Sequence, residues 1–561
     1  MKQLIRAGAL GPKTPLAVGM SLPWLLGRGA SLGISSAMNT VTVGEKPALH
    51  DRQGTVTWRE LDKRVNRMSH SLGAVGVKPG DHVAMVLRNS REWAEVALSA
   101  QRIGVVACPL NTWAKPKELS ATIRNSRPRV LFYDTAHAAQ VEECAPNHVP
   151  LVSVGDQADA LDGSLAYEDL IAEHGEHPPA PFVRRRGTPK VIIQTSGTTG
   201  TPKAASRDAA AAGLGVLANL MSVVPYRRDD IVYCPAPLFH SFGLATFALA
   251  TALGATLLLP ERFDPEGSLE LIEEHGATAA SFVPVMVRRI LSLDQDIRSR
   301  YDLSSLRIVM ASGSVLSNDV RRRATELFGS VLYDLYGSTE AGWVSIATPD
   351  DMLKEIHTVG RPVPGIQVKA MSATGEMLPT GETGELFVRS KVTFEGYISG
   401  EDAKTGDDGW MSIGDLGHVD ADGYLHVEGR ADDMVVVGGE NIYPVEVEQV
   451  IEDLPGVNEV AVVGLLDEEY GQILAAFIAG RVSEDEVVMA CRRELASYKV
   501  PRRIRIMDEL PRNATGKILK RELLRETGSA GPQKKGETGS AGPQKNGGTD
   551  SAGPQNSRGT D

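Results

Sequence analysis

Short apolar runs alternate with amphipathic segments along most of the chain. The run at 82–87 is followed by the segment 90–104, in which apolar residues recur at helical spacing. Further apolar runs, most of them rich in valine, isoleucine or leucine, lie at 105–110, 129–134, 190–197, 230–238, 255–260, 279–284 and 307–313. Strands that alternate with helices in this way are typical of parallel βαβ units. The pattern therefore predicts an α/β fold with doubly wound subdomains.

The pattern changes near residue 360 and again after Gly429. Between these points, short strand-like runs are separated by Gly and Asp-Gly turns, which favours a small antiparallel barrel or sheet, and of the two we expect a β-barrel. The segment from 430 to 525 reads as a compact α+β unit. We therefore predict an N-terminal domain over 1–429, a C-terminal domain over 430–525 and a tail over 526–561.

The two ends of the chain differ from the rest. In the tail the string SAGPQ begins at Ser529, Ser540 and Ser551, and no large apolar residue lies between the repeats. Such a segment cannot bury a core, so we expect disorder there and read no function from it.

Near the N-terminus, residues 16–26 are apolar but are interrupted by Pro23 and lack a signal-peptide cleavage site. Packing on the protein's own domain is the simpler interpretation, and a shallow contact with a membrane surface is the alternative.

Composition narrows the functional classes. The 561 residues include 59 basic and 71 acidic side chains, a net charge of −12 with a pI near 5.6. This balance gives no electrostatic footprint for nucleic acid. The four cysteines are far apart and form no CxxC pair, so a disulfide framework or a cysteine-based zinc site is not expected, and the cytoplasm is the expected compartment.

A loop rich in Ser, Thr and Gly gives the sharpest local signal. It spans 192–205, where an apolar strand runs into a hydroxyl- and glycine-rich turn closed by Lys203. Glycines let backbone N–H groups face an anion, while hydroxyls and an ammonium group add donors. The loop is a candidate triphosphate cradle, although the Walker A spacing cannot be laid on it.

Seven ordered motifs carry a resemblance to a known family. They lie at 195–203, 237–243, 336–342, 384–390, 408–417, 423–448 and 510–523. Together they resemble the adenylate-forming superfamily of acyl- and aryl-CoA synthetases, adenylation domains and luciferases, most of all fatty-acyl-CoA ligases, over about residues 40–525. The resemblance implies ATP, Mg²⁺ and coenzyme A as cofactors. It implies two half-reactions, in which a carboxylate forms acyl-AMP and a thiolate then displaces AMP.

The resemblance also implies roles for individual residues around the nucleotide. The β- and γ-phosphates would be held by the loop residues Thr195, Ser196, Gly197, Thr198, Thr199, Gly200 and Lys203. The adenine and ribose would be held by Gly313, Ser314, Tyr336, Asp415 and Arg430, with Asp334, Gly337 and Ser338 in the same motif as Tyr336. Thr339 would contact the α-phosphate, Glu340 would bind Mg²⁺, and His240 would gate the acyl pocket.

The same resemblance assigns a moving part to the C-terminal domain. Lys517 matches the lysine that contacts the carboxylate and the α-phosphate during adenylation, and a flexible ammonium group suits that use. Asp432 matches the family's hinge, and Gly438 and Gly439 would let the pantetheine arm of CoA pass close to backbone. We therefore expect the C-terminal domain to alternate between two positions.

One departure from the family pattern concerns the phosphate loop. Ala204 stands where the family usually has glycine. If that backbone needs a positive φ or lies against phosphate, alanine weakens adenylation; if the loop accepts ordinary geometry, the substitution is silent. Our reading is an ATP-dependent acyl-CoA synthetase for a hydrophobic acid. The alternatives are a ligase that uses acyl-AMP from a partner enzyme, a loader of an acyl carrier protein, and a non-catalytic adenylate-binding protein, which the retained Lys517, Glu340 and Asp415 argue against.

Overall fold

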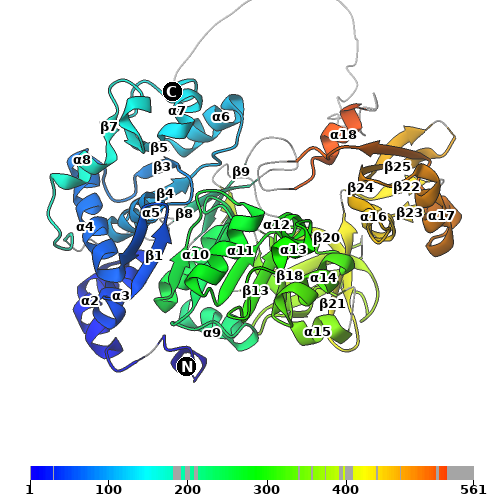
Figure 1. Ribbon diagram of the computed structural model, residues 1–561, viewed down its shortest axis with the longest axis horizontal. Helices are drawn as coiled ribbons and strands as arrows, with labels where there is room; N and C mark the ends of the chain where they lie inside the picture. The colour runs from blue at the N-terminus through cyan, green and yellow to red at the C-terminus, as the bar shows by residue number, and fades with distance from the viewer. Residues whose placement is uncertain are drawn as a thin grey trace, which may run out of the picture.

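The computed structural model has a large N-terminal domain and a smaller C-terminal domain, drawn at the right of Figure 1. It describes residues 2–9, 11–28, 31–180, 191–195, 203–207, 213–338, 341–354, 358–372, 374–390, 396–397, 409–431, 433–437, 440–467, 469–512 and 517–526. Within these ranges, no helix combines the length and the apolar character needed to cross a membrane. The predicted hinge at Asp432 and the tail lie outside the described residues, except Glu526, which ends a helix.

The first large sheet positions most of the candidate site. Its strand order is β16-β15-β14-β13-β12-β10-β11-β1-β2. Its strands are β1 (Pro47–Asp51), β2 (Gly54–Thr57), β10 (Ile231–Tyr233), β11 (Thr256–Leu258), β12 (Ala279–Phe282), β13 (Ile308–Ser312), β14 (Leu332–Ser338), β15 (Gly342–Ala347) and β16 (Arg361–Pro362). The central strands from β1 to β14 pair in parallel, as the sequence pattern predicted, and the antiparallel strands lie at the two edges.

A second large sheet carries the predicted phosphate loop. Its order is β19-β9-β8-β4-β3-β5-β6-β7. Its strands are β3 (His82–Val86), β4 (Val106–Pro109), β5 (Val130–Asp134), β6 (Leu151–Val154), β7 (Leu165–Ala166), β8 (Val191–Thr195), β9 (Lys203–Arg207) and β19 (Gly396–Tyr397). The strands from β8 to β7 are parallel, and β9 and β19 are antiparallel.

Helices connect and cover these sheets. They are α1 (Lys2–Arg6), α2 (Thr14–Arg28), α3 (Leu32–Val43), α4 (Trp58–Ala74), α5 (Arg91–Ile103), α6 (Pro116–Ser126), α7 (Ala138–Glu142), α8 (Tyr167–Ala172), α9 (Gly213–Val223), α10 (Ser241–Leu253), α11 (Pro265–His275), α12 (Pro284–Leu291), α13 (Gln295–Arg298), α14 (Asn318–Phe328) and α15 (Pro349–Lys354). One continuous apolar core joins the two sheets. Within it, Trp93 of α5 meets Phe247 of α10 edge to face, 5.3 Å between ring centroids.

The small β-barrel predicted after residue 360 is wrong for the described residues, which form an open antiparallel sheet there. Its order is β17-β18-β20-β21, with β17 (Gln367–Met371), β18 (Gly384–Arg389), β20 (Met411–Val419) and β21 (Leu425–Arg430). Two other short strands from this part of the chain join different sheets, because β16 pairs with β15 and β19 pairs with β9. The four remaining strands do not close on themselves.

The C-terminal domain is the predicted α+β unit. A two-stranded ribbon of β22 (Val435–Val437) and β23 (Glu440–Ile442) precedes a three-stranded sheet of β24 (Val457–Asp467), β25 (Gly471–Gly480) and β26 (Arg503–Met507). Its helices are α16 (Pro444–Glu452), α17 (Glu484–Glu494) and α18 (Lys520–Glu526). The two faces of β24 and β25 are covered by separate apolar clusters, so this domain has its own core.

Candidate active site

The carboxyl ends of the parallel strands β10, β12, β13 and β14 meet at one edge of the first sheet. In open α/β sheets this edge is where ligands bind. The loop with His240 follows β10, and Gly313 and Ser314 follow β13 and are exposed. Tyr336, Gly337 and Ser338 end β14. The topology therefore brings these predicted residues to one edge, as the motifs implied.

Local geometry at the end of β14 fixes the direction of Tyr336. The Ser312 hydroxyl donates to the Leu335 carbonyl at 2.8 Å and ties β13 to β14. The pairing of β14 with β15 shifts register between Tyr336 and Gly337. A Cβ at Gly337 would lie 2.0 Å from the Gly342 carbonyl oxygen, so only glycine fits there. The bulge turns the chain at the point where the sheet meets the site.

Three side chains from three strands form a hydrogen-bonded cluster. The Tyr336 hydroxyl donates a short hydrogen bond to Asp415 Oδ2. Arg430 Nη1 donates to Asp415 Oδ1 and to the Ile413 carbonyl, each at 3.0 Å. Asp415 and Arg430 lie directly opposite each other in the β20–β21 ladder. The cluster therefore joins the first large sheet to the small antiparallel sheet.

The surroundings of this cluster set its charge. Burial raises the pKa of Asp415 above its ordinary 3.8, while the Tyr336 hydrogen bond and the charges of Arg430 and Lys517 act in the opposite direction. Burial, together with the charge of Asp415, raises the pKa of Tyr336 well above 10, so the phenol keeps its proton. The phenol is therefore the hydrogen-bond donor of this pair, and Asp415 Oδ2 is the acceptor.

Lys517 comes from the C-terminal domain and is exposed. Its positive charge acts on Asp415 and lowers the pKa of that carboxyl. The residues just before it, 513–516, lie outside the described part of the chain. A lysine of the C-terminal domain therefore acts electrostatically on the cluster that the N-terminal sheets build.

The phosphate loop is described only at its two ends. β8 and β9 form an antiparallel pair in which Thr195 lies opposite Lys203, as expected for a strand that runs into a loop closed by Lys203. The candidate residues Ser196, Gly197, Thr198, Thr199 and Gly200 lie outside the described residues. Ala204 lies in β9 opposite Gln194, in extended backbone. The positive φ that would strain alanine is therefore not present at this position.

His240 caps the start of α10. Its Nδ1 accepts a hydrogen bond from the Phe242 N–H at 3.5 Å. Burial lowers the pKa of His240 to about 4, so the ring is neutral at pH 7. Its chain neighbour Phe239 is 7% exposed and meets Trp113 edge to face, 5.4 Å between centroids. The surroundings of the imidazole are therefore apolar and aromatic.

Two predicted site residues have other partners in the structure. The Asp334 carboxylate is buried, and Oδ2 accepts from Arg321 Nη2 at 2.7 Å, so this residue supports β14 from α14. The Ser338 hydroxyl accepts from the Ala341 N–H at 3.0 Å and closes the turn between β14 and β15. The intervening Thr339 and Glu340 lie outside the described residues, as do Gly438 and Gly439.

Sequence reasoning missed Gly414, which gives Arg430 its place. Gly414 has φ +73°, and a Cβ there would lie 3.0 Å from Arg430 Nη2. The neighbouring Ile413 accepts a hydrogen bond from Arg430 through its carbonyl, while its side chain is buried in the apolar cluster beside the small antiparallel sheet. Gly414 stands inside the 408–417 motif, so the sequence showed a glycine there. The sequence alone does not show that the Arg430 side chain packs against it.

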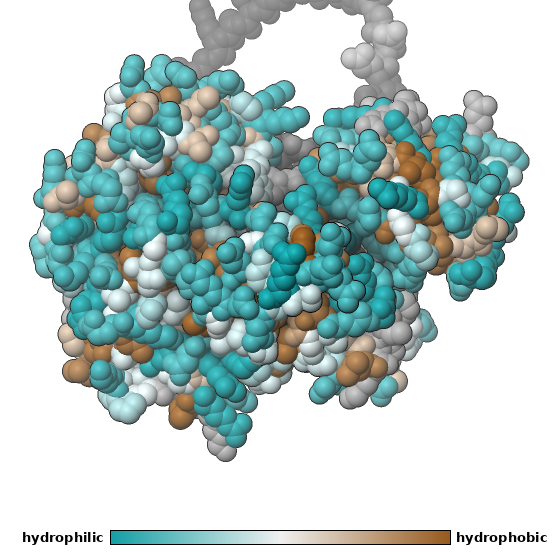
Figure 2. Space-filling model, viewed as in Figure 1, coloured by the Kyte–Doolittle hydropathy of each residue, from teal (hydrophilic) through white to brown (hydrophobic). Residues whose placement is uncertain are grey.

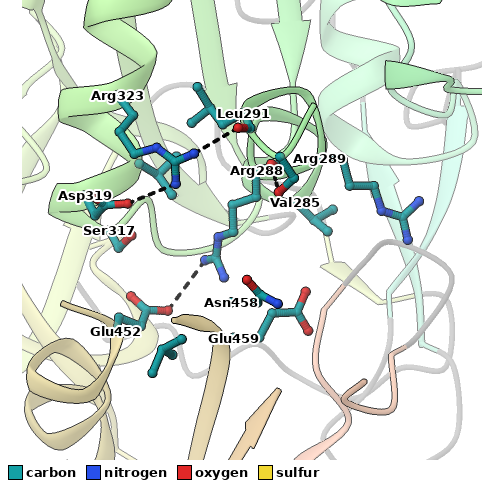
Figure 3. A pocket seen from close by; sticks show the side chains of 13 residues that line it. Val285, Arg288, Arg289, Leu291, Ser317, Asp319, Arg323, Glu452, Asn458 and Glu459 are labelled. Carbon is teal, nitrogen blue, oxygen red and sulfur yellow. Dashed lines mark hydrogen bonds and ion pairs between the residues drawn. The ribbon is translucent and has the colours of Figure 1, made fainter. Parts of the chain in front are cut away.

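A cavity of about 200 Å³ lies between the two domains (Figure 3). It is lined by α12, α14 and residues of the C-terminal domain. Arg288 Nη2 lies 3.6 Å from Glu452 Oε1 across this cavity. Because its lining includes none of the predicted site residues, we assign it to the domain contact and not to catalysis.

Comparisons with known proteins agree with the geometry. The pattern of the AMP-binding enzyme family matches residues 38–398, and that of the AMP-binding enzyme C-terminal domain matches residues 446–517. A putative acyl–CoA ligase, YdaB of Bacillus subtilis, is 32% identical over 86% of this chain and 96% of its own. The fatty acid–[acyl-carrier-protein] ligase ScoC of Streptomyces coeruleorubidus is 31% identical over 85% of this chain and 92% of its own.

A solved structure has the same fold. The o-succinylbenzoate CoA synthetase MenE from Bacillus subtilis, in complex with its acyl-adenylate intermediate, superposes with a TM-score of 0.76 and 26% identity, over 87% of this chain and 97% of that chain. The two family patterns together cover well over half of the sequence, with one match in each domain. The chain therefore belongs to the AMP-binding enzyme family, the adenylate-forming superfamily indicated by its motifs.

Proposed function

We propose that this enzyme is an AMP-forming acid–thiol ligase that joins a hydrophobic carboxylic acid to coenzyme A at the expense of ATP. The observation that carries the proposal is the Tyr336–Asp415–Arg430 cluster, which two sheets build together and on which the charge of Lys517 acts. The names of relatives and neighbours, which include acyl-CoA ligases and a complex with an acyl-adenylate, support the same reaction class.

The residues of the cluster fit a nucleotide. Asp415 accepts hydrogen bonds only, which suits the two hydroxyls of a ribose. Arg430 offers further guanidinium donors near the ribose or phosphate. The ring of Tyr336 provides a flat apolar face for adenine while its hydroxyl keeps Asp415 in place. In this proposal, Thr195 and Lys203 hold the β- and γ-phosphates from the ends of the β8–β9 hairpin.

Two displacements complete the reaction. The substrate carboxylate attacks the α-phosphorus of ATP, so that an acyl O–P bond forms, the bond to the β-phosphate oxygen breaks and pyrophosphate leaves. The thiolate of CoA then attacks the acyl carbon, and the C–O bond to AMP breaks. Lys517 stabilises the charge that builds on the α-phosphate in the first step. A Mg²⁺ ion bound with ATP neutralises phosphate charge, and its predicted ligand Glu340 lies outside the described residues.

The surroundings of His240 support a hydrophobic acid. A neutral imidazole whose chain neighbour Phe239 packs on Trp113 offers no charge to a polar acyl group and can shield apolar carbon from water. In our proposal His240 gates the acyl pocket next to the reacting carboxylate. The cytoplasm is the proposed compartment.

Two alternatives concern the supply and the acceptor of the acyl group. Supply of acyl-AMP by a partner enzyme becomes necessary only if adenylation is impaired, and the extended backbone of Ala204 removes one reason to expect that. Transfer to an acyl carrier protein in place of CoA has a specific precedent, because the relative ScoC is named a fatty acid–[acyl-carrier-protein] ligase. The proposal also includes a membrane contact at the N-terminus, which is argued from residues outside the catalytic site.

One assay separates these alternatives. The full chain is incubated with ATP, Mg²⁺ and a panel of fatty, aromatic and polycyclic acids, together with CoA, with a phosphopantetheinylated carrier protein, or with neither. Pyrophosphate release and acyl transfer are both measured, and a parallel set of reactions replaces ATP and the acid with preformed acyl-AMP. Acyl-CoA formed from a hydrophobic acid supports the proposal. Acyl transfer only to the carrier protein, or only from added acyl-AMP, replaces it with the corresponding alternative. No acyl transfer from any source contradicts it.

A further inference from the structure

The N-terminal residues differ in charge from the rest of the chain. The first acidic residue is Glu45, and the 44 residues before it contain four basic side chains, Lys2, Arg6, Lys13 and Arg28. The other 517 residues hold 55 basic and 71 acidic side chains, a balance of −16. The protein therefore has one positive end on an acidic body.

Helix α2 exposes apolar side chains at this positive end. One side of the helix is buried at Ala17 and Ser21, where it packs on α3. The other sides carry Leu16, Val18, Met20 and Leu22, which are 59%, 38%, 58% and 47% exposed; we call these four residues the α2 apolar face. On α1, which precedes α2 in the chain and packs on α9, Ile5 is 57% exposed. Figure 2 shows hydrophobic side chains at the surface at lower left, where Figure 1 places α2.

The segment is held against the domain. The Arg228 N–H donates to the Ala7 carbonyl at 2.7 Å, and the Arg228 guanidinium donates to the Ala9 carbonyl at 2.9 Å. At the start of α2, the Thr14 hydroxyl accepts from the Gly11 N–H at 2.8 Å. Because these contacts anchor the chain before α2 and α3 holds its other side, the α2 apolar face is a fixed surface of the N-terminal domain.

Length and charge select the partner. A helix of 15 residues is about 22 Å long, shorter than the roughly 30 Å hydrocarbon core of a bilayer, so α2 can lie in an interface but cannot span it. A second copy of this chain would bring a second positive end against the first, which like charges oppose. An anionic phospholipid surface offers phosphate groups to the exposed Arg6 and Lys13. The apolar side chains can enter the zone where the headgroups meet the acyl chains.

We propose that the α2 apolar face and the basic residues around it dock this protein on anionic phospholipid membranes. The acidic remainder of the chain is repelled by the same surface, which orients the docked protein with its N-terminal end toward the lipid. If the proposed ligase activity holds, this position places the enzyme where hydrophobic acids partition. The docking itself rests only on residues outside the catalytic site.

Vesicle flotation of the full chain tests the proposal. The vesicles consist of phosphatidylcholine alone, or of phosphatidylcholine and phosphatidylglycerol in equal parts, at low and at high salt. The test variant is Leu16→Glu/Met20→Glu. The matched control is Leu353→Glu/Met489→Glu, which adds the same charge at two apolar residues that are 73% and 64% exposed in α15 and α17. Thermal melting checks that both variants fold, and turnover of a short soluble acid checks that the site is intact.

We expect the unchanged protein to float with the mixed vesicles, less at high salt, and to bind phosphatidylcholine weakly. The test variant should bind about tenfold more weakly or worse. Two apolar side chains can no longer enter the lipid, and two negative charges are added next to an anionic surface. The control should stay within about twofold of the unchanged protein. Absence of flotation, equal losses in both variants, or a dimer in sedimentation velocity that only the test variant abolishes would each overturn the proposal. Flotation without ligase activity supports the docking and contradicts only the proposed function.

Discussion

Arg288 of α12 and Glu452 of α16 form an ion pair across the two domains, with 3.6 Å between Nη2 and Oε1. Both side chains are mostly buried, at 19% and 15% exposure. Burial raises the pKa of Glu452 from 4.5 to about 7; the charge of Arg288 acts in the opposite direction, while Glu448, Asp453 and Glu459 add to the rise. The strength of the contact between the domains therefore depends on whether Glu452 carries a proton.

We predict that Glu452→Gln stabilises the protein at pH 8 more than at pH 5. Below about pH 4.5 this carboxyl is protonated in the folded and the unfolded chain alike. Between about pH 4.5 and 7 the unfolded chain loses the proton first, so wild-type stability falls, by on the order of 3 kcal/mol, and the loss persists above pH 7. Glutamine has no proton to lose, so the difference in melting temperature between variant and wild type should grow by several degrees across this range.

Calorimetry at both pH values measures that difference. Glu469→Gln removes an exposed carboxylate from the same domain and serves as the control. A stability difference for Glu452→Gln that does not depend on pH would show that the burial of Glu452 is not linked to its proton.

A second prediction concerns Lys517. Lys517→Ala should slow acyl-AMP formation by about 100-fold or more, the scale of losing one preorganised charge at the transition state. Transfer from preformed acyl-AMP to CoA should change much less, because that step does not use the contact. Lys78→Ala removes an exposed lysine in the turn between α4 and β3 and should leave both steps unchanged. Equal losses in the two half-reactions would contradict domain alternation.

The hydrogen bond from Tyr336 to Asp415 gives a prediction about pH. Tyr336→Phe keeps the ring but removes the donor that lowers the pKa of Asp415. The pKa of Asp415 should rise further above 3.8, so AMP binding should be lost at a higher pH than in the wild type as the solution is acidified. Tyr333→Phe, a buried change on the same strand, is the matched control. Titration of AMP binding against pH measures the shift, and superimposable profiles for both variants would contradict it.

The sequence predicted the parts of this molecule that depend on local pattern. Buried strands such as β3, β5 and β13 appear as apolar runs because both of their faces are covered, and the motifs placed Tyr336, Asp415 and Arg430 in one site by resemblance. The Arg288–Glu452 and Asp334–Arg321 pairs had no such signal. The sequence does not show whether a charged residue is buried against a partner far along the chain or exposed to water. The open third sheet was missed for a related reason, since strand pairing is decided by tertiary neighbours.

The last prediction concerns Ala204, where the sequence left two outcomes open. In the structure Ala204 lies in β9 and pairs with Gln194, so its backbone is extended and alanine is not strained. Ala204→Gly should therefore change the rate of pyrophosphate release by less than about threefold, equivalent to about 0.7 kcal/mol of barrier. Glycine inside a strand should also lower stability, by roughly 0.5–1 kcal/mol, because the unfolded chain gains conformational freedom. Pyrophosphate release and thermal melting of both proteins test this. A gain of about tenfold from glycine would mean that the Cβ crowds a bound phosphate, and adenylation in this enzyme would then be impaired at the loop itself.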